Sequence, residues 1–315
     1  MKYLKIILPA ALVLAAVSCG KVDPSAIDDP ISDGNHLMVT ITVGRDPETK
    51  TSVSGAGKVS FTENDQLTLF QTVEHASGGT TTSIIKSNST SLISGGQRAS
   101  FLFDINTSGI TVNDDISYRA ATGDWSLDTD STPVVTVPSS LDPSSYSGSV
   151  LPPNGVITVS DRMSASVTDI SDVLNASVRL NHVVDYGVLD IQGLPDNAAA
   201  ITGIAVSDPS STIVGPARFD FETCMFTDAS SSALTITPSE EQQSQMKNNN
   251  GTAIWFTRIP ANTAPGKPSS LTVTLKDEDG NEWQGQFSEQ RSPDEPIPPT
   301  GSLTNVSIGT WNDLP

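Results

Sequence analysis

The sequence predicts an all-β chain built from antiparallel β-sandwiches, and two observations support this. Apolar and polar residues alternate in short segments along almost the whole chain, which is the period of a strand whose two faces meet different surroundings. Turn sequences such as GAGK, LPPNG and DEDGN separate these segments. Short strands at this spacing favour sandwiches, and 315 residues suffice for about two domains.

The composition narrows the classes of function. The chain has 36 Asp and Glu against 17 Lys and Arg, which gives a net charge of -19. Such a chain offers no basic surface to the phosphates of a nucleic acid, so nucleic acid is not expected as a partner. The single long apolar run lies at the N-terminus, which argues against a polytopic membrane protein.

Residues 1–18 have the features of a signal peptide for the Sec pathway. Lys2 and Lys5 provide the positive start, Ile6–Val17 is apolar, and small residues precede Cys19. This resembles a bacterial lipobox, so we predict that Cys19 is acylated after cleavage and anchors the chain to a membrane. The alternative is ordinary cleavage, with Cys19 incidental. Residues 19–36 are predicted to form an acidic, flexible tether, because they combine Gly, Pro and Asp with little apolar content.

The clearest strand is Leu37–Val43, in which Leu37, Val39, Ile41 and Val43 share one face. One hairpin, Leu271–Phe287, turns at DEDGN. Ser239–Asn248 is predicted to be a short helix with Ser239 as its N-cap. Further strands are predicted at Lys58–Thr62, Gln66–Val73, Ser83–Lys86, Ala99–Ile105, Ile116–Ala120, Val134–Val137, Val156–Val159, Ser177–Leu180, Gly187–Ile191, Ile201–Val206, Ala217–Phe221, Leu234–Thr237, Ala253–Ile259 and Val306–Trp311. We place the boundary between two domains near Asn175, which gives domains at 37–174 and 175–315.

No catalytic or metal-binding motif stands out. The three histidines, His36, His75 and His182, are scattered, and neither a nucleophile elbow nor a phosphate-binding loop occurs. We therefore expect no enzyme activity, no metal and no cofactor. Cys224, within FDFETCMF, is expected to be a small core residue. Trp125 lies between polar residues and is the candidate for an exposed contact with a glycan.

The N-terminal half resembles the fimbrillin-like (Mfa-like) family of Bacteroidetes. A lipidated leader and polar tether are followed by the strand Leu37–Val43 and the segments GRDPETKTSV and GAGKVSFTENDQLTLF. Members of that family have a Lys-Thr-Ser stretch, an aromatic residue, an acidic residue and an apolar strand ending in Phe. Lys50-Thr51-Ser52, Phe61, Asp65 and Leu67–Phe70 match these in order.

A second block, SDVLNASVRLNHVVDYGVLDIQGL, resembles the family at the start of its second half. Asp172, Leu174, His182 and Leu189 stand at matching places. Leu180 departs from the pattern, because an aromatic residue is commoner there. The resemblance implies a surface lipoprotein of the outer membrane with two transthyretin-like domains that serves as a pilus subunit or tip adhesin. Its partners would be other pilus subunits and a receptor on a host or bacterial surface.

The resemblance also implies maturation by strand exchange. An arginine-directed protease would remove the first strand, and a strand from another subunit would refill its place. Arg45 follows the first strand directly and is the cleavage candidate, with Lys50 as second choice. Val306 and Ile308 lie on one face of the C-terminal segment, which is either a donor strand or the last strand of its own domain. The alternative function is a glycan-binding outer-membrane lipoprotein of a polysaccharide-uptake system, and a secreted hydrolase has no motif in its favour.

Overall fold

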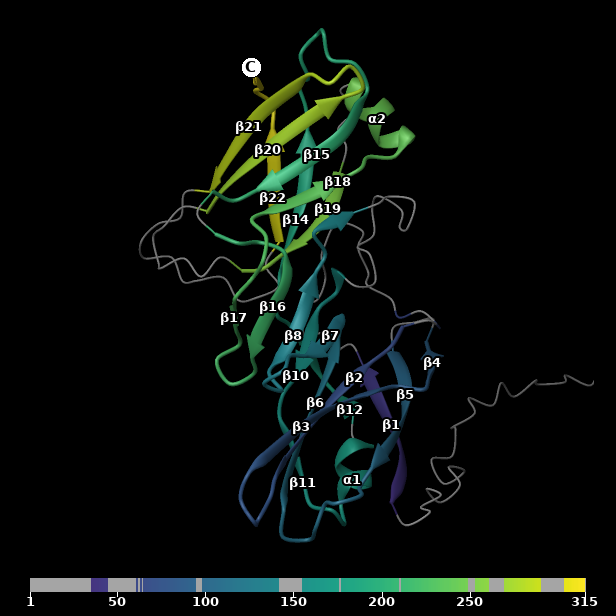
Figure 1. Cartoon of the computed structure of the whole chain (residues 1–315). Helices are drawn as coiled ribbons and strands as arrows, with labels where there is room; N and C mark the ends of the chain where they lie inside the picture. Colours follow the sequence, from purple (N-terminus) through teal and green to yellow (C-terminus); the bar gives the residue numbers. More distant parts are fainter. Residues whose placement is uncertain are drawn as a thin grey trace, which may run out of the picture.

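The structure is a computed structural model that describes residues 35–44, 61, 63, 65–94, 98–141, 155–175, 177–209, 211–248, 253–260, 269–289 and 303–314. Figure 1 shows an elongated molecule with a group of strands at each end and a smaller sheet between them. The described residues form mainly β-strands and two short helices, and most strand pairs are antiparallel. The predicted all-β sandwich class is confirmed. None of these helices combines the length and apolar character needed to cross a membrane.

The N-terminal sandwich has two layers. One sheet has the order β12-β1-β5-β4, and the other has the order β13-β10-β6-β2-β3, with β11 also paired to β6. The bounds are β1 His36–Gly44, β2 Thr68–Glu74, β3 Thr80–Lys86, β4 Ser89–Ile93, β5 Arg98–Asn106, β6 Asp115–Thr122, β10 Thr158–Ser160, β11 Met163–Ala165, β12 Ser177–Val178 and β13 Leu180–His182. Helix α1, Ile170–Leu174, packs against β1 and β11.

The core of this sandwich is built by strand alternation. In β1 from Val39 onward and in β5, every second residue points inward and is buried, while the residues between them are more exposed. In β6 both faces are covered, since Ser117 and Ala121 are buried as well as Ile116, Tyr118 and Ala120. Its main members are Val39, Ile41, Val43, Leu69, Val73, Phe101, Phe103, Ile105, Ile116 and Tyr118, with Ile170 and Leu174 from α1.

The C-terminal sandwich pairs the sheet β19-β14-β22 with the sheet β23-β21-β20-β15-β18-β9. The bounds are β9 Ser140–Leu141, β14 Asp185–Ile191, β15 Ile201–Ser207, β18 Ala233–Ile236, β19 Ala253–Arg258, β20 Ser269–Asp277, β21 Glu282–Glu289, β22 Leu303–Ile308 and β23 Asn312–Asp313. The predicted hairpin is confirmed, because Leu271 pairs with Phe287 and Leu275 with Trp283. The predicted helix is α2, Glu240–Lys247, and its N-cap Ser239 forms a capping box with Gln242.

A fifth sheet joins the two ends, and we call it the bridging sheet. It has the order β17-β16-β8-β7, with β7 Asp124–Leu127, β8 Pro133–Val137, β16 Gly215–Asp220 and β17 Met225–Thr227. Strands β7 and β8 precede the predicted boundary at 174/175, whereas β16 and β17 follow it. Conversely, β12 and β13 follow the boundary but pair with β1 and β10 of the N-terminal sandwich. Strand pairing therefore crosses the predicted boundary in both directions.

Two expectations about single residues are wrong. Trp125 is 2% exposed instead of lying on the surface. It sits on β7, where Asp124 and Ser126 face outward and Trp125 faces inward, so the polar neighbours mark a strand and not a loop. Cys224 is exposed instead of buried, because it occupies the turn between β16 and β17 with a positive φ of 53°.

Candidate functional site

The first strand lies in a slot of the N-terminal core. Val39, Ile41 and Val43 are 1%, 0% and 2% exposed, and Leu37 packs at the same face while remaining partly exposed. Phe103 and Phe101 of the neighbouring strand β5 lie directly beside Val39 and Ile41 and belong to the same core. The face of the strand that the sequence predicts to point into the core does point into it.

The two edges of β1 differ. On one side β5 pairs with it along its full length, from His36 opposite Asn106 to Gly44 opposite Arg98. On the other side β12 pairs in parallel with Thr42 and Val43 only. Along Met38–Ile41, no strand of the described chain pairs with β1 on the side away from β5. This stretch of β1 is a sheet edge, which is a place where another chain can add a strand.

The outward face of β1 is held by polar contacts. The hydroxyls of Thr42 and Ser100 lie 2.9 Å apart, and His36 Nδ1 lies 2.8 Å from Asp104 Oδ1. Both contacts reach β5, so they support the same edge as the backbone ladder. The strand is thus fixed by β5 and by the core, and only weakly by its other neighbour.

The predicted sites of acylation and of proteolytic cleavage lie outside the part of the chain that the structure describes. Cys19, Arg45 and Lys50 are outside the described residues. The described strand ends at Gly44, one residue before Arg45. Acylation of Cys19 and cleavage after Arg45 or Lys50 remain predictions.

The C-terminal candidates are seated in their own sandwich. Val306 and Ile308 are 0% and 3% exposed and pair in parallel with Leu189 and Ile191 of β14. Beyond the strand, Trp311 Nε1 donates a hydrogen bond of 2.8 Å to the carbonyl oxygen of Gln192. The sequence leaves open whether this segment is a donor strand or the last strand of its own domain. In this structure of a single chain it is the last strand of its own domain. Strand β22 is an edge strand of its sheet, with β14 on one side.

Gly285 explains how β22 sits so close to the opposite layer. A Cβ built at Gly285 would lie 2.3 Å from Cγ2 of Ile308 and 3.0 Å from the ring of Trp311. Only the missing side chain leaves room for Ile308. The seat of the C-terminal segment is therefore shaped for that segment.

Trp125 belongs to an aromatic cluster that ties the bridging sheet to the N-terminal sandwich. Its ring lies 5.4 Å from that of Phe70 and 5.6 Å from that of Phe219, edge to face, and stacks on Phe221 at 5.9 Å. Its indole N–H donates to the carbonyl oxygen of Thr122 at 2.8 Å. A ring covered on these sides offers no platform for a sugar, so we no longer assign Trp125 to glycan binding.

The histidines lie at separate places, each beside a different partner. His36 contacts Asp104, His75 Nδ1 lies 3.3 Å from Asp114, and His182 hydrogen-bonds the hydroxyl of Tyr186. Burial raises the pKa of Tyr186 and keeps its hydroxyl protonated. Among the described residues, no group of three His, Cys, Asp or Glu side chains is arranged to hold a metal ion.

One cavity went unnoticed in the sequence. It encloses 470 Å³ where the loops after β15, β17 and β19 meet the segments before β16 and β18. Its polar lining comes from Asp208, Ser211, Thr212, Thr227, Asp228 and Ser232. These residues come from two segments, the loop between β15 and β16 and the stretch from the end of β17 to the start of β18. Nothing local in the sequence indicates that the two segments converge.

Comparisons with known proteins give structural likenesses only. No family model and no curated protein sequence matches the chain. A candidate cell adhesion protein of Bacteroides uniformis is similar with a TM-score of 0.44 and 10% identity, over 88% of this chain and 95% of that one. A fimbrial assembly protein of Parabacteroides distasonis has a TM-score of 0.42 and 7% identity, over 89% and 98% of the two chains.

A candidate adhesin of Bacteroides ovatus is similar with a TM-score of 0.41 and 8% identity, over 86% of this chain and 92% of that one. These organisms are Bacteroidetes, and the descriptions of the three structures fit the resemblance to fimbrillin-like proteins. The low identities and TM-scores leave the function to be argued from the residues of this chain.

Proposed function

We propose that the chain is a fimbrillin-like surface lipoprotein, a pilus subunit or tip adhesin, that joins other subunits by exchange of its first strand. The observation that carries the proposal is the seat of β1. Val39, Ile41 and Val43 fill the core, while the edge along Met38–Ile41 has no partner strand among the described residues. To leave, the strand has to break its ladder with β5 and, on the other side, only the short pairing of Thr42 and Val43 with β12.

Removal of β1 would leave an apolar slot that must be refilled. Burying one Val or Ile side chain fully is worth roughly 1.5–3 kcal/mol, so three such positions account for several kcal/mol. The backbone groups of β5 that face β1 would also lose their partners. Both losses are recovered if a strand with alternating β-branched residues enters from another chain.

The C-terminal strand of a second copy has the pattern that the slot requires. Val39-Thr40-Ile41 in β1 and Val306-Ser307-Ile308 in β22 place Val and Ile on one face with a hydroxyl residue between them. To act as a donor, β22 would leave β14 and give up the hydrogen bond between Trp311 and Gln192. Exchange would therefore move β22 from its place beside β14 to the slot of β1 in another subunit, where it buries similar side chains.

The predicted lipid on Cys19 places the chain at the outer membrane and on the cell surface, and the tether 19–36 holds the first sandwich away from the lipid. The net charge of -19 suits a solvated outer face that does not self-associate by default. A tip adhesin of this type would present its far end to a receptor on a host or bacterial cell.

Cleavage with an arginine-specific protease tests the first step. Intact-mass measurement is expected to show loss of the chain up to Arg45, followed by multimers on size-exclusion chromatography. The Arg45→Ala variant is expected to keep its mass and stay monomeric, while Lys50→Ala is cleaved like the natural chain. If the chain recovered from the cell surface still begins at Cys19, maturation at Arg45 is wrong.

A peptide covering residues 303–311 tests the second step. We expect it to bind the cleaved chain and not the uncleaved one, and to lose binding when Val306 and Ile308 are both replaced by Asp. A peptide with Ser307→Asp keeps the apolar face and is the matched control. Equal binding by the doubly substituted peptide would remove β22 as the donor while leaving cleavage untouched.

A further inference from the structure

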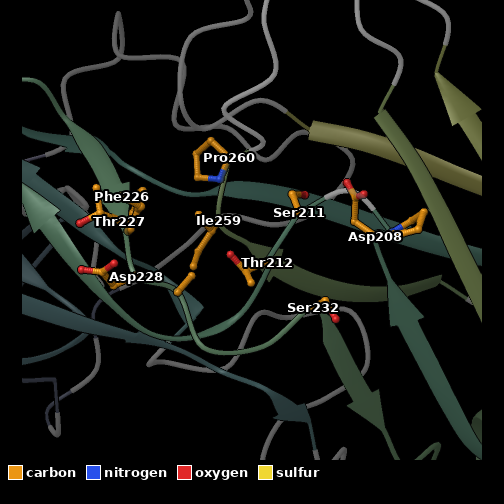
Figure 2. A pocket seen from close by; sticks show the side chains of 11 residues that line it. Asp208, Ser211, Thr212, Phe226, Thr227, Asp228, Ser232, Ile259 and Pro260 are labelled. Carbon is orange, nitrogen blue, oxygen red and sulfur yellow. The ribbon is translucent and has the colours of Figure 1, made fainter.

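The cavity at the base of the C-terminal sandwich is a second site, separate from the slot of β1. Figure 2 shows residues of several loops converging on it, with Phe226, Thr227 and Asp228 on one side and Asp208, Ser211 and Ser232 on the other. Its volume of 470 Å³ lies within the range of about 300–1,000 Å³ that small-molecule sites occupy.

The walls of the cavity are fixed by backbone hydrogen bonds. The N–H of Ile259 donates to the carbonyl oxygen of Ile213 at 2.7 Å, and that of Asp208 donates to Ser232 at 3.2 Å. Val214 and Ser231 form an isolated β-bridge between the same segments. The pocket is therefore preformed, and binding of a ligand costs little free energy for ordering the loops.

The lining combines hydroxyls with an apolar floor. The Oγ of Ser211 is shielded from solvent and has no hydrogen-bond partner within the described chain. Thr212, Thr227 and Ser232 add exposed hydroxyls around it. Phe226 and Ile259, both nearly buried, supply apolar surface between these groups. Hydroxyls both donate and accept, so they match ligands that carry hydroxyls themselves.

Charge restricts the ligand further. Asp208 and Asp228 are the ionisable residues of the described lining, which holds no Lys, Arg or His. Carboxylates accept hydrogen bonds from hydroxyl groups but repel anions. The lining itself therefore offers no cation to a phosphate, a sulfate or an acidic sugar. Arg218, whose Nε lies 3.9 Å from Asp228, is outside the lining and is already paired with that carboxylate and with Asp128.

We propose that this pocket binds one neutral sugar unit of a glycan. The exposed hydroxyls of Thr212, Thr227 and Ser232 hydrogen-bond the hydroxyls of the sugar, and the C–H groups of its ring touch the small exposed parts of Phe226 and Ile259. The site is independent of strand exchange, since none of its residues belongs to β1, β5 or β22. The chain would thus carry a receptor-binding pocket in addition to the means of assembly.

Saturation-transfer NMR on the full chain tests this inference with glucose, galactose and mannose as neutral probes and glucuronate as the acidic probe. We expect transfer to at least one neutral hexose and none to glucuronate. The double variant Thr212→Val with Ser232→Ala is expected to weaken binding about tenfold, because it removes two exposed hydroxyls that hydrogen-bond the sugar. Thr80→Val, an exposed threonine of β3, is the matched control and is expected to bind like the natural chain.

Three results would overturn the proposal. These are no transfer to any neutral hexose, unchanged binding by the double variant, or glucuronate bound as well as the hexoses. The Arg45→Ala chain separates this site from assembly, since it is expected to bind the hexoses normally although its first strand is retained. If the natural chain fails to exchange its first strand after cleavage but still binds the hexoses, only the proposed assembly is contradicted.

Discussion

Single polar side chains fix the loops that join these strands. Asp114, which is 7% exposed, accepts hydrogen bonds from the backbone N–H of Thr111 at 2.8 Å and of Ala76 at 2.9 Å. His75 adds a weaker contact at 3.3 Å. The two backbone hydrogen bonds, supported by His75, lower the pKa of Asp114 to about 2 because they favour the charged carboxylate.

Asp114 is expected to make the fold sensitive to acid. The pKa of Asp114 in the folded chain lies below its ordinary value of 3.8, so the stability that the carboxylate provides is present above pH 3.8 and is lost as the pH falls toward 2. Asp114→Asn should lower the urea midpoint at neutral pH and make the acid-induced loss shallower. Asp115→Asn, its exposed neighbour, should behave like the natural chain. Parallel pH profiles for all three proteins would contradict this role.

A close approach across the C-terminal sheet gives a second prediction for a single residue. A Cβ at Gly187 would lie 2.2 Å from the ring of Phe256, which stands directly opposite on β19. Gly187→Ala is therefore expected to lower the free energy of unfolding by about 1–3 kcal/mol through overpacking. Gly203→Ala is the control, since its Cβ would meet Lys276 at an ordinary 3.8 Å. Urea titration measures both, and equal losses would refute the cause.

Residues on long alternating strands could be placed from the sequence, whereas residues on a short strand or in a turn could not. Val39 and Ile41 follow a clean alternation, so their inward face is readable from neighbours alone. Trp125 also alternates with Asp124 and Ser126, but its strand has four residues, too few to stand out from a loop. Cys224 is exposed because it lies in a turn with a positive φ. Its apolar neighbours in the sequence suggest a buried strand and give no sign of this turn.

Among the elements, β1 has deeply buried side chains on one face but pairs with only two residues along one of its edges. Its inner side chains belong to the core, but its ladder on the β12 side is limited to Thr42 and Val43. Side-chain packing is therefore the larger part of what retains the strand on that side. Variants of its two faces should consequently have unequal effects.

Ile41→Ala is expected to cost about 2–4 kcal/mol of stability, because it removes a fully buried side chain and leaves a cavity. Thr40→Ala, on the outward face of the same strand, should change stability by about 0.5 kcal/mol or less. Urea titration of the two variants checks the difference. Losses of similar size would mean that β1 is held mainly by its backbone and not by the slot.

Elements made of neighbouring residues were predictable, while their partners were not. The hairpin β20–β21 and helix α2 carry their own turn and cap residues, so the sequence alone indicates them. The pairing of β8 with β16 joins segments about eighty residues apart, and no local signal selects one partner over another. The sugar pocket depends on the same kind of long-range convergence.

For the whole molecule, the bridging sheet couples the two sandwiches. Val135 of β8 pairs with Ala217 of β16, and both are buried. Arg218 of β16 adds ion pairs of 2.7 Å to Asp128 and 3.3 Å to Asp130 in the turn between β7 and β8. Hydrogen bonds, packing and charge thus all join segments from the two halves of the sequence.

We therefore expect the chain to unfold in one transition, although chains of this size often unfold in steps. Tryptophan fluorescence reports mainly on the bridging sheet and the C-terminal sandwich, since residues 35–122 contain no Trp, although Trp125 touches the N-terminal sandwich at Phe70. Far-UV circular dichroism reports on all strands. The two urea curves should coincide. Val135→Ala should shift both together, and Thr136→Ala, on the other face, should shift neither by much. Separate midpoints would show that the sandwiches unfold independently.

The bridging sheet also determines how the molecule responds to tension. Its strands β8 and β16 run roughly along the long axis, between the two ends (Figure 1). A pull on those ends loads the hydrogen bonds between β8 and β16 in shear, so that they must break together and not one after another. Resistance to such a pull depends on the unfolding rate under force and not on equilibrium stability. For the proposed role at the cell surface, this sheet would let the chain hold an attachment against flow.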